Sequence, residues 1–218
     1  MDKQKIIAFL DNLVSLGIYF YCVSVPFGIA PTQIGMITAL VSWLLLAVLK
    51  KEVLSRNTVM TVPILLFLAT QLLSVFFSID VGRSIHEFRS YWHILAFFLV
   101  SCVRADVLKR GLLLTIASTA VSSLIGMGQY VYSRYIVGGA MAEHRVSSTM
   151  GMYMTFSGIL MIEAIVCLAF LLYGGFDRKG KWGIGAGLFL IMSALVCTLT
   201  RSAWLGMIAG VAAIGIVK

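Results

Sequence analysis

Long apolar runs recur along the whole 218-residue chain and limit what it can fold into. The runs are about 16 to 24 residues long, which is the length that an α-helix needs to cross a bilayer. Hydrophobic residues make up 60% of the chain and charged residues only 12%, whereas a soluble domain is close to half apolar and one-quarter charged. The sequence therefore predicts an all-α fold, a polytopic transmembrane helical bundle.

About eight spans are predicted, all within a single membrane domain that covers residues 1–218. No segment between them is long enough for a soluble domain, and we find no internal repeat. The fourth span is short, and the last two are so close that they form either a tight hairpin or one interrupted region. The expected spans are Ile6–Val25, Ile34–Leu49, Val59–Phe77, Tyr91–Val103, Leu112–Tyr132, Met150–Tyr173, Gly183–Leu199 and Ala203–Val217.

The basic residues divide unequally between the two sides of the predicted membrane. With a cytoplasmic N-terminus, twelve of the seventeen fall in inner segments, which is the sign that the positive-inside rule requires. All eight lysines are among the twelve. The five outer basic residues are all arginines: Arg83, Arg89, Arg134, Arg145 and Arg201. Topology alone does not favour arginine over lysine, but the planar arginine fork suits phosphate or carboxylate. We therefore expect an anionic ligand at the outer face, with phosphate as the leading candidate.

Arg201 lies at the outer end of a predicted span, within VCTLTRSAWLGMIAG. One interpretation is an arginine whose side chain extends to the membrane interface. The other is a guanidinium that holds an anion at the mouth of a cavity. The hydroxyls of Thr198, Thr200 and Ser202 support the second interpretation. The next span also begins here, so its free N–H groups and positive dipole end favour an anion at the same place.

A second anion-binding pattern is EHRVSSTMGMYMTFSG, in which Arg145 precedes Ser147, Ser148 and Thr149 at the start of the sixth span. Hydroxyls and backbone amides at a helix start, beside an arginine, can bind an anion. Ordinary capping by Ser148 or Thr149, with Arg145 in solvent, explains the pattern equally well.

The outer segment SIDVGRSIHEFRSYWH contains Arg83 and Arg89 together with His86 and His93. Positions 86, 87 and 90 share a helical face with Arg83, which predicts an amphipathic helix on the outer membrane surface. Internal pairing of arginine with glutamate is the simpler explanation of its charges. Neither histidine has a carboxylate partner nearby in sequence, so a general-base role lacks support.

Glu163 lies in the body of the sixth predicted span, where an ionisable residue suggests a functional site with a partner. It is either a proton-coupling site or the structural partner of an arginine from another span. The Gly183/Gly187 and Gly206/Gly210 spacings are explained by helix packing.

Several kinds of chemistry have no motif in this sequence. We find no P-loop, D-x-D pair or HExxH, which disfavours nucleotide-donor chemistry, and we expect no cofactor and no metal. The four cysteines lie in or beside apolar runs without CxxC spacing, which favours small core residues over disulfides or metal ligands. The net charge of +8 comes without a dense basic tract, so nucleic acid is not an expected partner.

Two of these stretches resemble the O-antigen ligase and O-antigen polymerase superfamily of bacterial inner-membrane proteins. TLTRSAWLGM resembles its Thr-x-Ser-Arg-x-Ala-Trp-Leu type of signature. RVSSTMGMYMTFSGIL resembles the segment in which an arginine precedes a Gly-rich turn and a helix. SIDVGRSIHEFRSYW stands where the family has an outer Ser-x-Asp stretch and a short helix. The resemblance covers most of the chain in order, through short motifs.

The resemblance implies a metal-independent membrane glycosyltransferase that acts on the periplasmic side in lipopolysaccharide, O-antigen or exopolysaccharide biosynthesis. Such proteins transfer a glycan from a polyprenyl-diphosphate carrier, such as undecaprenyl diphosphate, to a glycan or lipid acceptor such as the lipid A core. Membrane lipids are the other expected partners. The resemblance gives diphosphate binding to Arg201, Arg145 and Arg89. The candidate supporting residues, read from the sequence itself, are Thr200, Ser202, Ser148 and Glu163.

The chain departs from the family pattern in two ways. Thr200 takes the place of the usual serine before Arg201. The family also continues beyond the position of Lys218, into a periplasmic loop with a histidine taken to be the base, and into further spans. We therefore expect an N-terminal portion of a ligase, with its catalytic residue unknown and no transfer by this portion alone. Two other classes stay open: a transporter or flippase for a lipid-linked or anionic substrate, and a non-catalytic assembly subunit.

Overall fold

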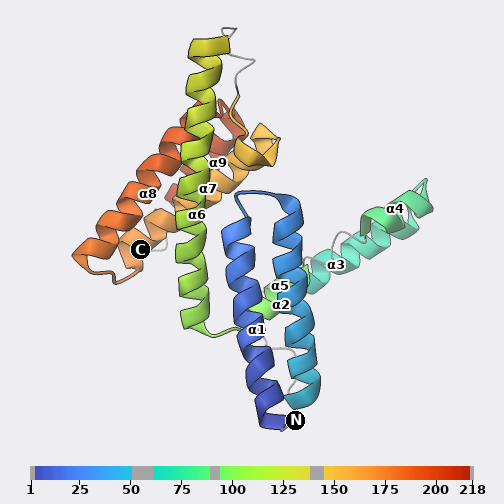
Figure 1. Ribbon diagram of the computed structural model, residues 1–218. Helices are drawn as coiled ribbons and strands as arrows, with labels where there is room; N and C mark the ends of the chain where they lie inside the picture. Colours follow the sequence, from blue (N-terminus) through green and yellow to red (C-terminus); the bar gives the residue numbers. More distant parts are fainter. Residues whose placement is uncertain (1–2, 51–60, 89–93, 138–144, 217–218) are drawn as a thin grey trace. The chain divides into compact units, whose positions relative to one another are not determined.

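A computed structural model describes residues 3–50, 61–88, 94–137 and 145–216 (Figure 1). Within these residues all regular structure is helical and there is no strand, so the predicted all-α fold is confirmed. The helices are α1 (Lys3–Ser24), α2 (Ile29–Lys50), α3 (Thr61–Phe76), α4 (Val81–Phe88), α5 (Leu95–Cys102), α6 (Ala105–Tyr132), η2 (Ser133–Val137), η4 (Ser148–Met150), α7 (Tyr153–Tyr173), α8 (Arg178–Cys197) and α9 (Arg201–Ile216).

Seven of the eight predicted spans fall on apolar helices of 16 residues or more, whereas the fourth, Tyr91–Val103, meets only the eight-residue α5 among the described residues. A helix of that length is too short to cross a membrane. Five stretches are long and apolar enough to cross a membrane: α1, α2, α6 continued to Ile136, α7 and α8. The helices α3 and α9 are apolar but shorter, with 16 residues each. The chain is thus a multi-pass membrane protein. The sequence left open whether the last two spans form a tight hairpin or one interrupted region. The structure has the hairpin, two helices joined by the short turn Thr198–Thr200.

The helix α6 has the polarity expected of a helix in lipid. Its buried face carries hydroxyl side chains, and its exposed face carries large apolar ones. The buried set is Thr115, Ser118, Thr119, Ser122 and Ser123, and the exposed set is Leu112, Leu114, Val121, Leu124 and Ile125. Steps of three and four residues place the hydroxyls on one side of the helix. In water the apolar side would turn inward, so the reverse arrangement fits surroundings of lipid.

The helices form two compact units, which are described separately. Unit 1 comprises Met1–Gly17 and Met36–Leu108, and unit 2 comprises Ile18–Gly35 and Lys109–Lys218. In unit 1, α1 and α2 approach closely at Gly17, where an added Cβ would lie 2.8 Å from the backbone nitrogen of Ala39. Only glycine fits so close an approach. The expectation of one domain over residues 1–218 stays a prediction.

The segment predicted as an amphipathic helix is helical up to Phe88. It begins after Asp80, whose Oδ1 accepts a hydrogen bond from the backbone nitrogen of Arg83 at 3.0 Å. This is the usual way in which aspartate caps a helix. The helix, α4, packs against α3 within unit 1. Its location on a membrane surface stays a prediction.

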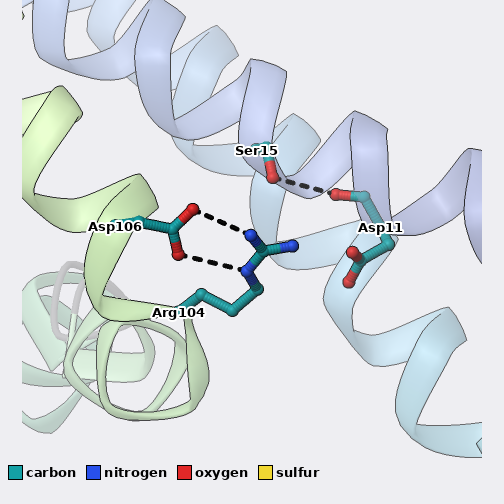
Figure 2. Close-up of polar contacts among 4 residues, drawn as sticks. All are labelled: Asp11, Ser15, Arg104 and Asp106. Atoms are coloured by element: carbon teal, nitrogen blue, oxygen red, sulfur yellow. Dashed lines mark hydrogen bonds and ion pairs between the residues drawn. The ribbon is translucent and has the colours of Figure 1, made fainter.

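Arg104, which the sequence predicts on the inner side, forms a two-pronged ion pair with Asp106 (Figure 2). Its Nε and Nη2 donate to Oδ1 and Oδ2 at 3.1 and 2.8 Å. On α1, the Ser15 hydroxyl donates to the Asp11 carbonyl oxygen at 3.1 Å. Because both side chains of the pair are largely exposed, it contributes at most about 1 kcal/mol to stability. The Asp106 carboxylate also lies in the first turn of α6, where the helix dipole favours negative charge.

In unit 2, α7 packs against both α8 and α9. The residues at the centre of this core are Phe156, Leu160, Ala164, Cys167, Ile191, Ala194 and Leu195, all fully buried. Gly206 lies against Met161, and Gly210 lies against Ile165. From the first contact to the second, the residue number rises by four on both helices, so α7 and α9 run parallel. The prediction that Gly206 and Gly210 serve helix packing is therefore confirmed.

The glycines of α8 differ from each other. A Cβ on Gly187 would lie 3.2 Å from Ile116 of α6, whereas nothing lies within 4 Å of one on Gly183. Packing therefore explains Gly187 but not Gly183. The four cysteines are free thiols: Cys167 is buried, Cys22 and Cys197 are half-buried, and Cys102 is exposed.

Candidate anion-binding site

The two arginines of the predicted motifs lie at the same end of unit 2. Arg201 is the first residue of α9, and the parallel packing places it level with Phe156 in the first turn of α7. The guanidinium carbon of Arg145 lies 4.7 Å from the ring centroid of Tyr153, the first residue of α7. Both arginines are exposed. The fold thus brings two arginines that are far apart in sequence to one level of the bundle.

The opposite end of unit 2 carries lysines. The Nζ of Lys109 donates to the carbonyl oxygen of Gly174 at 3.4 Å and lies 4.4 Å from the ring centroid of Phe176. Lys179 and Lys181 follow in the first turn of α8. The outer arginines and inner lysines predicted from the sequence are thus separated along α7. Which end faces the cytoplasm stays a prediction.

A buried hydrogen-bond network holds the segment after Arg145 against α6. The Ser148 hydroxyl donates to the Ser122 carbonyl oxygen at 2.9 Å and lies 2.8 Å from the Ser122 hydroxyl. The Ser122 hydroxyl also donates to the Pro26 carbonyl oxygen at 3.0 Å. The Gln129 side chain donates to the carbonyl oxygen of Ser148 at 3.1 Å. Ser148 therefore uses its hydroxyl inside the protein and fixes the chain that follows Arg145.

Both motifs contain a residue with a left-handed backbone. Ser148 has φ 50° and Leu199 has φ 53°, and these are the non-glycine residues with positive φ in the described ranges. Such a conformation is unfavourable for residues with a side chain and persists only where the surroundings enforce it. The network around Ser148 does so in the first motif. In the second, the residues on either side of Leu199 are buried.

The turn before Arg201 is fixed by two threonines. The Thr198 hydroxyl donates to the Leu195 carbonyl oxygen at 2.7 Å, and the Thr200 hydroxyl donates to the Thr198 carbonyl oxygen at 3.2 Å. Their hydroxyls point into the turn, whereas Ser202 is exposed beside Arg201. The first backbone N–H groups of α9 have no partner within the helix. Arg201, Ser202 and these N–H groups together can bind an anion.

Among the other predicted site residues, the structure places Glu163 relative to this end, but not Arg89 or Arg83. Arg89 lies outside the described residues, and Arg83 belongs to unit 1. Glu163 lies two turns beyond Phe156 along α7, about 10 Å deeper along the helix axis. Any support that Glu163 gives to the anion site would therefore have to act over that distance.

A groove between α7 and α9 lies away from the arginines. Its volume is about 270 Å³, and it is lined by Leu168, Leu172, Tyr173, Val211, Ile214 and Gly215. This lining is at the lysine end of α7, so the groove is not part of the candidate anion site. Over the described ranges, no three His, Cys, Asp or Glu side chains gather as metal ligands would.

The sequence analysis missed the hydroxyl-lined face of α6. Its signal was present in TIASTAVSS, where five hydroxyl residues recur at steps of three and four. Ser122 on this face anchors the segment after Arg145, and Thr119 and Ser123 lie beside it in the interior.

The fold and the site together define a class, a multi-pass helical membrane protein with two exposed arginines at one end of its larger unit. Comparison of the chain with protein-family models, with curated proteins and with solved structures finds no match.

Proposed function

We propose that the chain provides the donor-binding site of a bacterial inner-membrane glycosyltransferase of the O-antigen ligase type. Such an enzyme takes a glycan from a polyprenyl-diphosphate carrier on the periplasmic side and passes it to a glycan or lipid acceptor in polysaccharide or lipopolysaccharide synthesis. The observation that carries the proposal is the placement of Arg145 and Arg201 at one end of unit 2, level with the starts of α7 and α9.

The chemistry of this end suits a lipid diphosphate. Two guanidinium groups offer paired N–H donors that match phosphate oxygens, and the helix starts add free backbone N–H groups. Met154 and Leu205, on either side of this level and within about one turn of it, expose apolar side chains. A polyprenyl tail in the surrounding lipid would contact them there. When the glycosidic bond breaks, negative charge grows on the leaving diphosphate, and arginine beside it stabilises that charge.

The proposal is tested by binding of geranylgeranyl diphosphate to the purified chain in lipid nanodiscs, with geranylgeranyl monophosphate as the comparison ligand. Arg201→Lys keeps the charge but loses the fork. Loss of one hydrogen bond between charged groups reduces the binding free energy by about 1.5–3 kcal/mol. We therefore expect the diphosphate to bind roughly 10- to 100-fold more weakly to this variant.

The matched control is Arg178→Lys, because Arg178 is also the first residue of a helix but lies at the lysine end. We expect its diphosphate affinity to equal that of the unchanged chain. Equal losses in the two variants, or equal affinity of the unchanged chain for diphosphate and monophosphate, would contradict the proposal. Accumulation of the diphosphate inside proteoliposomes would instead favour the transporter alternative.

A further inference from the structure

Three buried oxygen atoms in unit 2 have no hydrogen-bond partner: Oε2 of Glu163, Oγ1 of Thr119 and Oγ of Ser123. The side chains of Thr119 and Ser123 are fully buried, and Glu163 is only 6% exposed. Polar atoms inside a membrane protein are normally paired within the protein, because lipid provides no hydrogen bonds. These three oxygens, on α6 and α7, can therefore still form a hydrogen bond or take up a proton.

The three residues lie at similar levels along the axis of the bundle. The helices α6 and α7 run in opposite directions, since Gly126 lies against Phe156 at one end and Lys109 bonds to Gly174 at the other. Interpolation between these contacts places Glu163 level with Thr119. Ser123 is one turn further toward the arginine end.

The surroundings of Glu163 offer no compensating charge. The titratable groups near its carboxyl include the thiols of Cys22 on α1 and Cys167 on α7. The residues that α8 buries are apolar, as is Ala203 of α9, and the buried face of α6 carries hydroxyls. No ion pair joins Glu163 to any basic residue within the described ranges. The pairing with an arginine that the sequence left open thus has no support here.

An ionised carboxylate in such surroundings, without a counter-charge, is strongly unfavourable. A carboxylic acid avoids that penalty and can donate a hydrogen bond to a hydroxyl. We propose that Glu163 is a buried proton-binding site, which exchanges its proton through the hydroxyls of Thr119 and Ser123 with the end of unit 2 where Arg145 lies. The proton comes from water and returns to it, and only O–H bonds form and break.

The hydroxyls of α6 provide the route. Thr119 and Ser123 are one turn apart, about 6 Å along the axis, and each hydroxyl can donate and accept. The proposed path requires a buried water where two of these groups are too far apart to bond directly. Next to Ser123, Ser122 contacts Ser148, and that segment begins at Arg145. This inference goes beyond the proposed function, because diphosphate binding does not require a proton at this depth.

The test is infrared spectroscopy of the purified chain in lipid at neutral pH, as the difference between the unchanged chain and Glu163→Gln. We expect the C=O stretching band of a protonated carboxylic acid in the unchanged chain, shifted on transfer to D₂O. The control is Asp106→Asn, which removes an exposed carboxylate paired with Arg104 and should remove no such band. If Glu163→Gln removes only carboxylate bands, Glu163 is ionised and the proposal is wrong. Loss of the acid band on addition of Na⁺ would also overturn it, in favour of a cation site.

The route is tested by the rate at which the Glu163 band shifts in D₂O. The double variant Thr119→Val with Ser123→Ala keeps nearly the same volume and should slow this exchange several-fold without removing the band. The control is Thr115→Val, on the same buried face, whose hydroxyl bonds to the Gly111 carbonyl oxygen one turn back. Equal exchange rates in the double variant, the control and the unchanged chain would overturn the route.

Discussion

Replacement of Gly210 by alanine perturbs the contact that sets α9 against α7. The added Cβ would meet Cδ1 of Ile165 and would lie 2.8 Å from its Cγ1. Ile165 cannot turn away easily, because a β-branched side chain in a helix has one strongly preferred rotamer. Overpacking of this kind costs about 1–3 kcal/mol, whereas alanine gains roughly 0.5–1 kcal/mol over glycine in a helix. We therefore expect a net loss of up to about 2 kcal/mol in the free energy of unfolding.

The matched control is Gly215→Ala in the same helix, because nothing lies within 4 Å of its added Cβ. Only the helix preference changes there, so the free energy of unfolding should rise by up to about 1 kcal/mol. The assay is denaturant unfolding in detergent micelles, followed by tryptophan fluorescence.

A second variant, Ile165→Ala, removes the atoms that the new Cβ would meet. Combined with Gly210→Ala, it should destabilise by less than the sum of the two single changes, since contacting residues are coupled. If Gly210→Ala stabilised the protein as much as Gly215→Ala does, the parallel packing of α7 and α9 would be wrong, and with it the shared level of Arg145 and Arg201.

Substitutions at Leu199 and Ser148 test the two motifs locally. Leu199→Gly should raise the free energy of unfolding by about 1 kcal/mol, because φ 53° disfavours any residue with a Cβ. Leu199→Val should lower the free energy of unfolding. Equal stabilities of the two variants would contradict the left-handed turn. Ser148→Ala should lower the free energy of unfolding by about 1–3 kcal/mol, because buried groups of the Ser122 network lose their partner, and it should speed tryptic cleavage after Arg145. The control Thr149→Ala, at an exposed position, should change neither the stability nor the cleavage rate. Identical cleavage rates in the two variants would refute the anchoring role of Ser148.

The helices could be predicted because apolar length alone sets a membrane span. The residues at which a helix begins and ends depend on capping, and the length of an apolar run gives no information about capping. The predicted seventh span begins at Gly183, but α8 already begins at Arg178, since Asp177 caps it by accepting a hydrogen bond from the nitrogen of Gly180 at 3.0 Å. The first turn of α8 is therefore helical although its residues are polar.

The candidate site could be predicted only in part. The two arginines and their neighbouring hydroxyls were visible as motifs, and Gly206 and Gly210 were visible as a small-residue pair. The sequence does not show which helix this pair contacts, because that depends on the tertiary structure. The contact with α7 brings Arg201 to the level of the first turn of α7. The roles of Ser148 and Thr200 also differ from the motif reading, because burial turns both hydroxyls toward backbone carbonyls.

The most direct test of the central claim is photo-crosslinking with a polyprenyl diphosphate that carries a photoreactive group next to the diphosphate. The labelled positions are read by mass spectrometry of the purified chain in lipid. The account predicts labelling near Tyr153 and Ser202, at the arginine end of unit 2. Labelling confined to the other end, near Lys109 and Lys179, would contradict it.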